Sequence, residues 1–347
     1  MNSTPTLDRS GVAAAIGAAL LFGASTPIAK LLLAHVGPWM LAGLLYLGSG
    51  VGLTAYRIAT RAPATPLPRD EVRWFAGAIA AGGVVGPVLL MFGLAAMPAS
   101  GASLLLNAEA VFTALLAWFA FKENFDRRIA LGMALIVFGA VVLAWPGEAR
   151  FAGIRPTLAI LGACLAWGID NNLTRKVSLA DATWIASIKG LAAGAVNFTI
   201  ALSLGSSVPL TIELGGALIV GFFAYGVSLA LFVVALRNLG TARTGAYFST
   251  APFFGAAIAL LLGDALTAQL VVAGALMGIG VWLHLTERHE HSHVHEPMEH
   301  SHRHVHDEHH QHAHDAAWDG TEPHTHVHRH ERMAHSHAHY PDAHHRH

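Results

Sequence analysis

Residues 107–139 read NAEAVFTALLAWFAFKENFDRRIALGMALIVFG, and they predict two apolar helices joined by a short charged turn. The same pattern returns 141 positions later (253 − 112), where Phe253 corresponds to Phe112 and Gly280 to Gly139. A repeat of this length, built from apolar segments, is typical of a membrane protein that consists of two related halves.

The segments before this pattern repeat as well. Residues 17–23 correspond to residues 162–168, and Trp39 corresponds to Trp184 at an offset of 145 (184 − 39). Each half contains five predicted spans, and because five is an odd number the second half enters the membrane from the opposite side. The sequence therefore predicts inverted repeats, whose substrate sites lie near the membrane midplane between the halves.

The composition agrees with a membrane protein. The chain of 347 residues is 54% hydrophobic and 12% charged, with a mean hydropathy of +0.48, whereas soluble domains carry about 25% charged residues. The apolar segments reach the roughly 20 residues that span a bilayer. We predict spans at residues 11–34, 38–59, 73–96, 99–121, 126–145, 155–176, 181–204, 211–237, 241–262 and 266–286.

The predicted fold is thus an all-α integral membrane protein with ten transmembrane helices in two inverted five-helix repeats. The repeats are residues 11–145 and 155–286, after a short cytoplasmic N-terminus at 1–10 and before a tail at 287–347. Most Lys and Arg residues fall on one side of this arrangement, which the positive-inside rule assigns to the cytoplasm. We therefore expect both termini in the cytoplasm and, because Arg, Ala and Gly are abundant, the inner (cell) membrane of a bacterium.

The charged turns carry a family resemblance. Phe121-Lys-Glu123 and Leu262-Gly-Asp264 each precede a glycine-containing last span, after an alanine-rich entry to the fourth or ninth span. Over about residues 11–286 the chain resembles the EamA-type family of the drug/metabolite transporter superfamily. The resemblance implies secondary transport of small organic metabolites. The chain departs from the family pattern at Asp264, where Glu is usual, and at Val111, where Pro is usual, so Glu109 is particular to this branch.

Polar residues inside the spans are the candidates for the transport site, because a charge at bilayer depth costs on the order of 3 kcal/mol and usually faces a cavity or a partner. Glu109 lies in the fourth span and Asp170 in the sixth, where Trp167, Asp170 and Thr174 share a helical face. The alternative is a buried ion pair or hydrogen bond that only locks the bundle. The candidates for the substrate and proton pathway are Glu109, Asp170, Asn171, Asn107, Trp167, Thr174, Lys30, Lys189 and Tyr247.

Proton coupling follows from the same two carboxylates as a hypothesis. A low-dielectric cavity favours the neutral form of a carboxyl group, which could then exchange protons near neutral pH. Transport would then be driven by the proton gradient through Glu109 or Asp170.

The tail after Glu287 is rich in histidine and poor in large apolar residues, so we expect disorder. Of the 24 histidines, only His35 and His284 precede it. Imidazoles at His-x-His spacing bind Zn, Ni and Co, so we predict a metal-binding tail of low specificity. Its ligand candidates are His289, His291, His293, His295, His300, His302, His304, His306, His324, His326, His328, His330, His335, His337 and His339.

The leading functional prediction is a secondary transporter of a small organic metabolite, such as an amino acid or a drug-like solute, that works by alternating access. The alternative is a Ni, Co or Zn transporter or a metal-regulated carrier, although the spans have no histidine near their centres. We predict no enzyme activity and no catalytic residues, because paired catalytic carboxylates, an activated nucleophile and a nucleotide-binding loop are all missing. We expect no required cofactor, with the lipid bilayer, the solute, protons and metal ions at the tail as partners. Nucleic acid is not expected, and monomer and homodimer stay open.

Overall fold

The computed structural model describes residues 9–62, 67–69, 71–121, 127–145, 154–174, 177, 181–239, 244, 247–285, 290–295, 298–304, 324–330 and 333–338. The chain divides into two compact units, Met1–Glu287 and Arg288–His347. The first unit contains the helical body at residues 9–285.

All regular structure described in the body is helical. Helices are the natural form for these alanine- and leucine-rich segments, because a helix satisfies its own backbone hydrogen bonds in an apolar surrounding. The first half contains α1 (Arg9–Leu32), α2 (Pro38–Ala59), α3 (Val72–Ala78), the π-helix η1 (Ile79–Val85), α4 (Gly86–Ala95), α5 (Ala99–Leu105), α6 (Ala108–Phe121) and α7 (Arg127–Ala144). The second half contains α8 (Ile154–Thr174), α9 (Ala182–Ser203), α10 (Thr211–Gly221), the π-helix η3 (Phe222–Val227), α11 (Ser228–Leu239), α13 (Ala251–Leu261) and α14 (Ala268–Leu285).

A helical segment lies within each of the ten predicted spans, with α3, η1 and α4 forming one continuous run and α10, η3 and α11 another. Among the described residues, six helices are long and apolar enough to cross a membrane, and three further apolar helices are shorter. The structure thus supports an integral membrane protein, while the count of ten spans stays a prediction.

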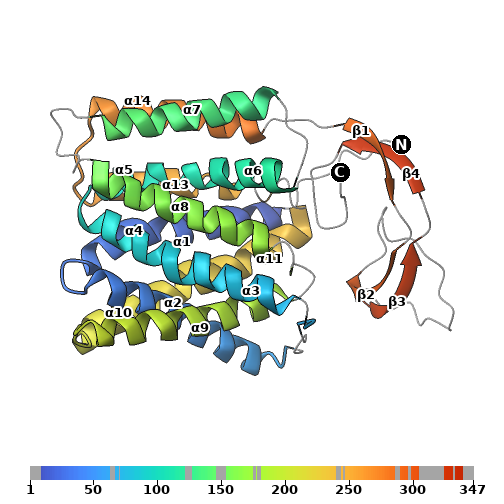
Figure 1. Cartoon of the computed structure of the whole chain (residues 1–347), viewed down its shortest axis with the longest axis horizontal. Helices are drawn as coiled ribbons and strands as arrows, with labels where there is room; N and C mark the ends of the chain where they lie inside the picture. The colour runs from blue at the N-terminus through green and yellow to red at the C-terminus, as the bar shows by residue number, and fades with distance from the viewer. Residues whose placement is uncertain are drawn as a thin grey trace. The chain divides into compact units, whose positions relative to one another are not determined.

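The two halves have equivalent elements at nearly constant spacing. Helices α1 and α8 begin 145 residues apart (154 − 9), α7 and α14 begin 141 residues apart (268 − 127), and the π-helices begin 143 residues apart (222 − 79). Equivalent helices also pack on each other, since α2 lies along α9 and α7 lies along α14 (Figure 1). Helix α1 packs on α11 and α13 in the way that α8 packs on α4 and α6.

Glycines bring α2 and α9 close together. A Cβ atom on Gly190 would stand 2.7 Å from the Cα of Gly50, and one on Gly194 would stand 2.6 Å from the backbone nitrogen of Leu47. Such contacts replace side-chain packing with backbone packing, the usual way in which small residues join helices in lipid. The α2–α9 pair therefore ties the two halves together.

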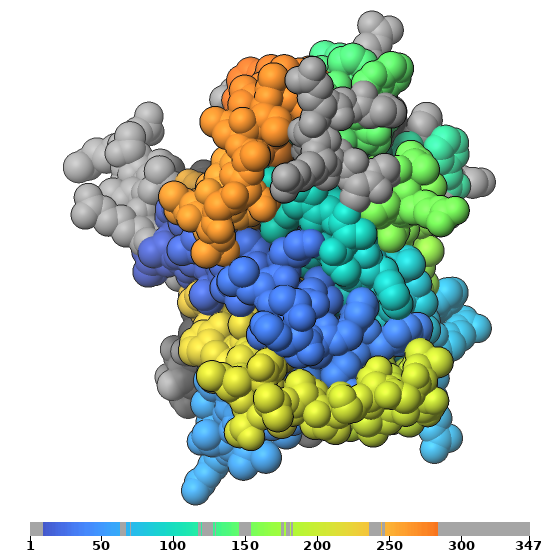
Figure 2. All heavy atoms as spheres, turned by 90° about the vertical axis from the view of Figure 1, so that its left-hand side faces the viewer, coloured from blue at the N-terminus to red at the C-terminus, as the bar shows by residue number. Residues whose placement is uncertain are grey.

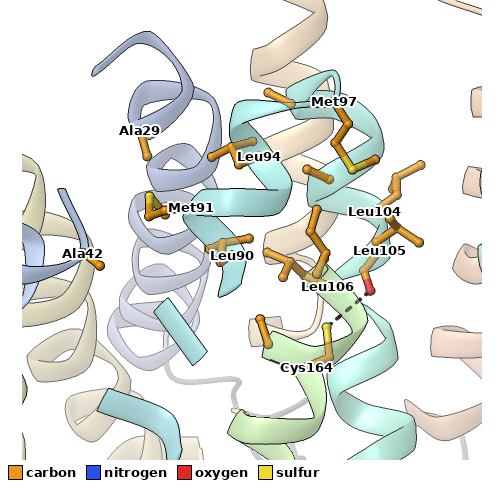
Figure 3. Close-up of a cluster of buried hydrophobic side chains, with 14 of the residues drawn as sticks. Ala29, Ala42, Leu90, Met91, Leu94, Met97, Leu104, Leu105, Leu106 and Cys164 are labelled. Carbon is orange, nitrogen blue, oxygen red and sulfur yellow. Dashed lines mark hydrogen bonds between the residues drawn. The ribbon is translucent and has the colours of Figure 1, made fainter. Parts of the chain in front are cut away.

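The large apolar core includes the place where α4, α5 and α8 meet. Leu90, Met91 and Leu94 from α4 pack near Leu105 and Cys164, and all five are at most 2% exposed (Figure 3). The Cys164 thiol donates to the backbone carbonyl of Leu105 over 3.6 Å. This packing fixes α8 against the first half, and the C-terminal end of α8 carries the polar residues Asp170, Asn171 and Thr174.

The tail unit contains four strands, paired as β1 (Glu290–His295) with β4 (Met333–Ala338) and β2 (Met298–His304) with β3 (His324–His330). Both pairs are antiparallel. These strands were not predicted from the sequence, and the expectation of a disordered tail stays a prediction. Alternation of histidine with other residues has the two-residue period of a β-strand, and cross-strand backbone hydrogen bonds form without an apolar core. His289, His306 and His339 lie outside the described residues.

Candidate functional site

The centre of the candidate site is an ion pair between α8 and α9. Lys189 Nζ contacts Asp170 Oδ2, and the two side chains are only 17% and 8% exposed. Asp170 Oδ1 accepts a second hydrogen bond from the Thr174 hydroxyl at 2.9 Å, one helical turn further along α8. A buried ion pair with one extra hydrogen bond is the arrangement that keeps charge tolerable in an apolar interior.

The π-helix η1 lies directly against this pair. A π-turn is wider than an α-turn and exposes backbone carbonyls, which need partners when they are buried. The Gly82 carbonyl accepts from the Tyr46 hydroxyl at 2.8 Å and from Trp167 Nε1 at 2.9 Å. The Gly83 carbonyl accepts from Asn197 Nδ2 at 3.1 Å. Side chains from α2, α8 and α9 therefore converge on one π-helical turn of the first half.

Glu109 enters from α6 on the adjoining face of α8. Its Oε1 accepts from Asn171 Nδ2 at 2.9 Å, and the same nitrogen donates to the Thr113 hydroxyl at 3.2 Å. Glu109 is also close enough to Asp170 and Lys189 to interact with both electrostatically. Two carboxylates and one ammonium group are thus gathered where α6, α8 and α9 approach η1.

Six of the predicted site residues therefore lie in this cluster, which we call the central cluster: Trp167, Asp170, Asn171, Thr174, Lys189 and Glu109. Sequence reasoning missed Tyr46, Gly82, Thr113 and Asn197. Tyr46 and Asn197, both inside predicted spans, could have been found by their type, since a buried polar side chain usually has a hydrogen-bond partner.

Lys30 lies elsewhere. Its Nζ donates to the carbonyls of Leu94 at 2.7 Å and Ala95 at 3.0 Å, the last residues of α4. Nearby, Asp264 Oδ2 accepts from the backbone N–H of Ser100 at 2.8 Å, in the first turn of α5. Figure 2 looks at this end of the body, where the α1–α2 (blue), α4–α5 (teal) and α13–α14 (orange) connections meet. This is the predicted outer end, and both side chains tie helix ends there.

Asn107 and Tyr247 are also outside the central cluster. Asn107 is 4% exposed, and its Nδ2 donates to the Leu104 carbonyl at 2.9 Å, in the break between α5 and α6. Tyr247 packs with Leu231 on a small apolar cluster of Ala14, Ala15 and Ala235. The structure thus gives these two residues local structural contacts.

The predicted inner end holds another ion pair, and this one joins the two halves. Arg57 Nη1, near the end of α2, contacts Asp181 Oδ1, and it donates to the Thr183 hydroxyl at 2.5 Å. Asp181 also caps α9 by accepting from the backbone N–H of Trp184 at 2.8 Å. Burial works to raise the pKa of Asp181, but the hydrogen bonds from Thr183 and Trp184 and the charge of Arg57 outweigh it and leave that pKa lowered.

Potential metal ligands do not form a cluster of three or more in the described part of the body. No group of three or more His, Cys, Asp or Glu residues among the described residues is arranged to hold a metal ion. The central cluster offers carboxylates, amides and an ammonium group, which are ligands for organic ions and protons rather than for transition metals.

Comparisons with known proteins bear on the fold and the family of this chain. A solved crystal structure has the same fold at a TM-score of 0.59 and 18% identity, covering 78% of this chain and 95% of that one. An uncharacterised transporter of Methanothermobacter thermautotrophicus is 28% identical over 79% of this chain and 85% of its own. A "probable amino-acid metabolite efflux pump" of Salmonella typhimurium is 26% identical over 77% of this chain and 91% of its own.

The family assignment rests on both halves. The model of the EamA-like transporter family matches residues 9–145 and, a second time, residues 155–286. These two matches coincide with the repeats that the helices show, from α1 to α7 and from α8 to α14. With two matching halves and charged groups held between apolar helices, the chain belongs to the EamA-like transporter family.

Proposed function

We propose that this protein carries a small organic solute across the bacterial inner membrane by alternating access, with the central cluster as its binding site. The observation that carries the proposal is the Asp170–Lys189 pair, held against η1 of the other half. Burying a charge at this depth costs free energy, so such residues usually serve a function. Inverted-repeat transporters place their substrate sites between the halves. The printed name of the Salmonella relative makes amino acids the first solutes to test.

The proposal includes coupling to protons. Glu109 accepts a hydrogen bond from a neutral amide, Asn171, whereas Asp170 has the counter-charge of Lys189. A carboxylate without a bound cation is the better proton carrier, because protonation does not have to break an ion pair. We therefore assign the proton step to Glu109 and keep Asp170 as the second candidate.

The test is uptake and efflux in proteoliposomes that contain the full-length protein or a version ending at Glu287. An amino-acid and metabolite panel and a Zn, Ni and Co panel are offered under an imposed pH gradient. Flux of an organic solute that survives loss of the tail supports the proposal. Metal flux that survives loss of the tail contradicts it.

The proton step needs its own comparison. Glu109→Gln removes the proton site and keeps the size, and Asp170→Asn does the same at the ion pair. We expect Glu109→Gln to transport independently of the pH gradient. Equal response of the wild type and both variants to the gradient, or equal indifference, would show that neither carboxylate couples transport to protons.

A second activity is proposed for the tail, namely binding of Zn, Ni or Co ions. The strand register aligns the Cα atoms of His291 with His337, His293 with His335, His300 with His328, His302 with His326 and His304 with His324. Antiparallel partners lie about 5 Å apart at their Cα atoms, which brings histidine positions near enough to share one ion.

Calorimetric titration of the full-length protein with Ni²⁺ tests this second proposal. His293→Gln with His335→Gln removes an aligned pair, whereas His295→Gln with His330→Gln removes two histidines whose Cα partners are methionines. We expect the first variant to lose more bound nickel than the second. Equal losses would mean that the histidines act without regard to register.

A further inference from the structure

The ion pair can be compared with the equivalent residues of the first half, because the two halves are repeats. At the offset of 145, Asp170 corresponds to Ser25 (170 − 145) and Lys189 to Leu44 (189 − 145). Trp167 likewise corresponds to Phe22 (167 − 145). The first half therefore builds the same helices at the same positions with neutral residues.

The neutral residues at these positions of the first half are well packed. Ser25 is 3% exposed and its hydroxyl donates to the Phe22 carbonyl of its own helix at 2.6 Å, while Leu44 is 1% exposed. Phe22 meets the π-helical Tyr225 edge to face at 5.7 Å between ring centroids, where the other half has Trp167 bonded to Gly82. Helices α1 and α2 thus pack on η3 without charge at these positions, in the way that α8 and α9 pack on η1. Because replacing a buried ion pair by packed apolar residues is often neutral or stabilising, the fold does not require Asp170 and Lys189.

We infer that Lys189 binds the carboxylate of the transported solute and that Asp170 occupies this position in the solute-free protein. This inference rests on the proposed function and names the solute's chemistry. An ammonium group has three donors, and among the described residues Lys189 Nζ contacts one acceptor, Asp170 Oδ2. When the solute displaces it, Asp170 keeps the Thr174 hydroxyl on Oδ1.

Charge balance then restricts the solute. The titratable groups around Asp170 in the described residues are Lys189 from α9, Glu109 from α6 and Tyr46 from α2. An anion that takes Lys189 leaves Asp170 and Glu109 as two carboxylates with no protein cation between them. One positive charge must therefore arrive with it, either an ammonium group on the same solute or a proton. A zwitterion binds without a proton, and a simple carboxylate binds together with one.

Three probes of one carbon skeleton separate these cases: L-leucine, 4-methylpentanoate, which lacks the amine, and 3-methylbutylamine, which lacks the carboxylate. Binding to the full-length protein in nanodiscs is measured between pH 6.5 and 7.5. We expect the affinity for 4-methylpentanoate to rise about tenfold when the pH falls by one unit, as one linked proton requires. The affinity for L-leucine should stay constant. Inorganic phosphate is a fourth probe, and tighter binding of phosphate than of leucine would overturn the assignment to a carboxylate.

The decisive variant introduces the residues that the first half has at the equivalent positions, with Asp170→Ser together with Lys189→Leu. We expect it to fold with an unchanged melting temperature, to lose at least about tenfold in affinity for L-leucine and 4-methylpentanoate, and to keep its weaker affinity for the amine. The single variant Lys189→Arg, which keeps Asp170 and a positive charge at residue 189, should keep carboxylate binding. Lys30→Met removes a lysine at the far end of the helices, and it should keep the wild-type preference among the probes.

Each outcome is decisive. A double variant that fails to fold would show that the pair is structural, and one that still binds leucine normally would show that Lys189 is not the anion site. Binding of none of the four probes to the wild type would also overturn the inference. The proposed function fails separately, when no organic solute crosses the membrane in the flux experiment.

Discussion

A Cβ atom on Gly82 would overlap the carboxylate of Asp170, so the ion pair exists only because residue 82 has no side chain. We expect Gly82→Ala to push Asp170 away from Lys189 and to abolish most transport. Forcing one methyl group into such packing costs about 1–3 kcal/mol, which thermal unfolding in detergent would register as a lower melting temperature.

The matched control for this change is Gly278→Ala in α14. A Cβ atom there would meet only the ring of Phe253, at 3.7 Å, which is ordinary contact. Flux and melting temperature of this variant should stay close to those of the wild type. If Gly82→Ala behaved like Gly278→Ala, the π-helical turn would be softer than its contacts indicate.

A second prediction concerns the join between the halves. Gly190→Val would add three carbons at a position where even a Cβ atom would stand 2.7 Å from the Cα of Gly50, so α2 and α9 would have to separate. Because these contacts are between backbones, no rotamer change relieves them, and we expect a loss of stability of several kcal/mol, beyond the usual cost of overpacking. Size-exclusion chromatography and melting curves would show aggregation or early unfolding. Gly215→Val in α10, with no atom within 4 Å of its Cβ position, is the control and should purify normally.

Much of the helical body could be predicted from the sequence, for a definite physical reason. Apolar segments of bilayer length form helices in lipid, and the spacings of 141 and 145 that relate Phe112 to Phe253 and Trp39 to Trp184 reappear between the helices of the two halves. The strand pairing in the tail was not predicted, because low hydrophobicity was weighed above the two-residue period of its histidines.

The central cluster was less predictable. Intramembrane charge pointed to Glu109, Asp170 and Lys189, because residue type and place within a predicted span are enough to show that a charge is buried at a cost. The sequence could not show which of the two carboxylates, Asp170 or Glu109, pairs with Lys189. That choice depends on how α8 is rotated about its axis. The importance of Gly82 was also not predictable, because it depends on the lack of a side chain in the space that Asp170 fills.

The pH dependence of stability should reveal the Arg57–Asp181 pair. The pKa of Asp181 is lowered in the folded protein, so its contribution to stability is present above the unfolded value near 3.9 and is lost as the pH falls through the folded value. We expect the melting temperature to fall more steeply between pH 5 and about 3 in the wild type than in Asp181→Asn, and the two curves to approach each other at the acid end. Parallel curves would mean that the ion pair contributes nothing to stability.

The orientation in the membrane can be tested with single cysteines, because the natural Cys164 is 0% exposed and should not react with a thiol reagent. Thr60, at the end of α2, and Ser207, between α9 and α10, are both exposed, and the positive-inside rule puts them on opposite sides. In intact cells a membrane-impermeant maleimide should label Ser207→Cys, and it should label Thr60→Cys only after the cells are permeabilised. Ser292→Cys, in β1, should behave like Thr60→Cys if the tail is cytoplasmic. Labelling of Thr60→Cys from outside would invert the topology and would put Lys30 and Asp264 at the inner end.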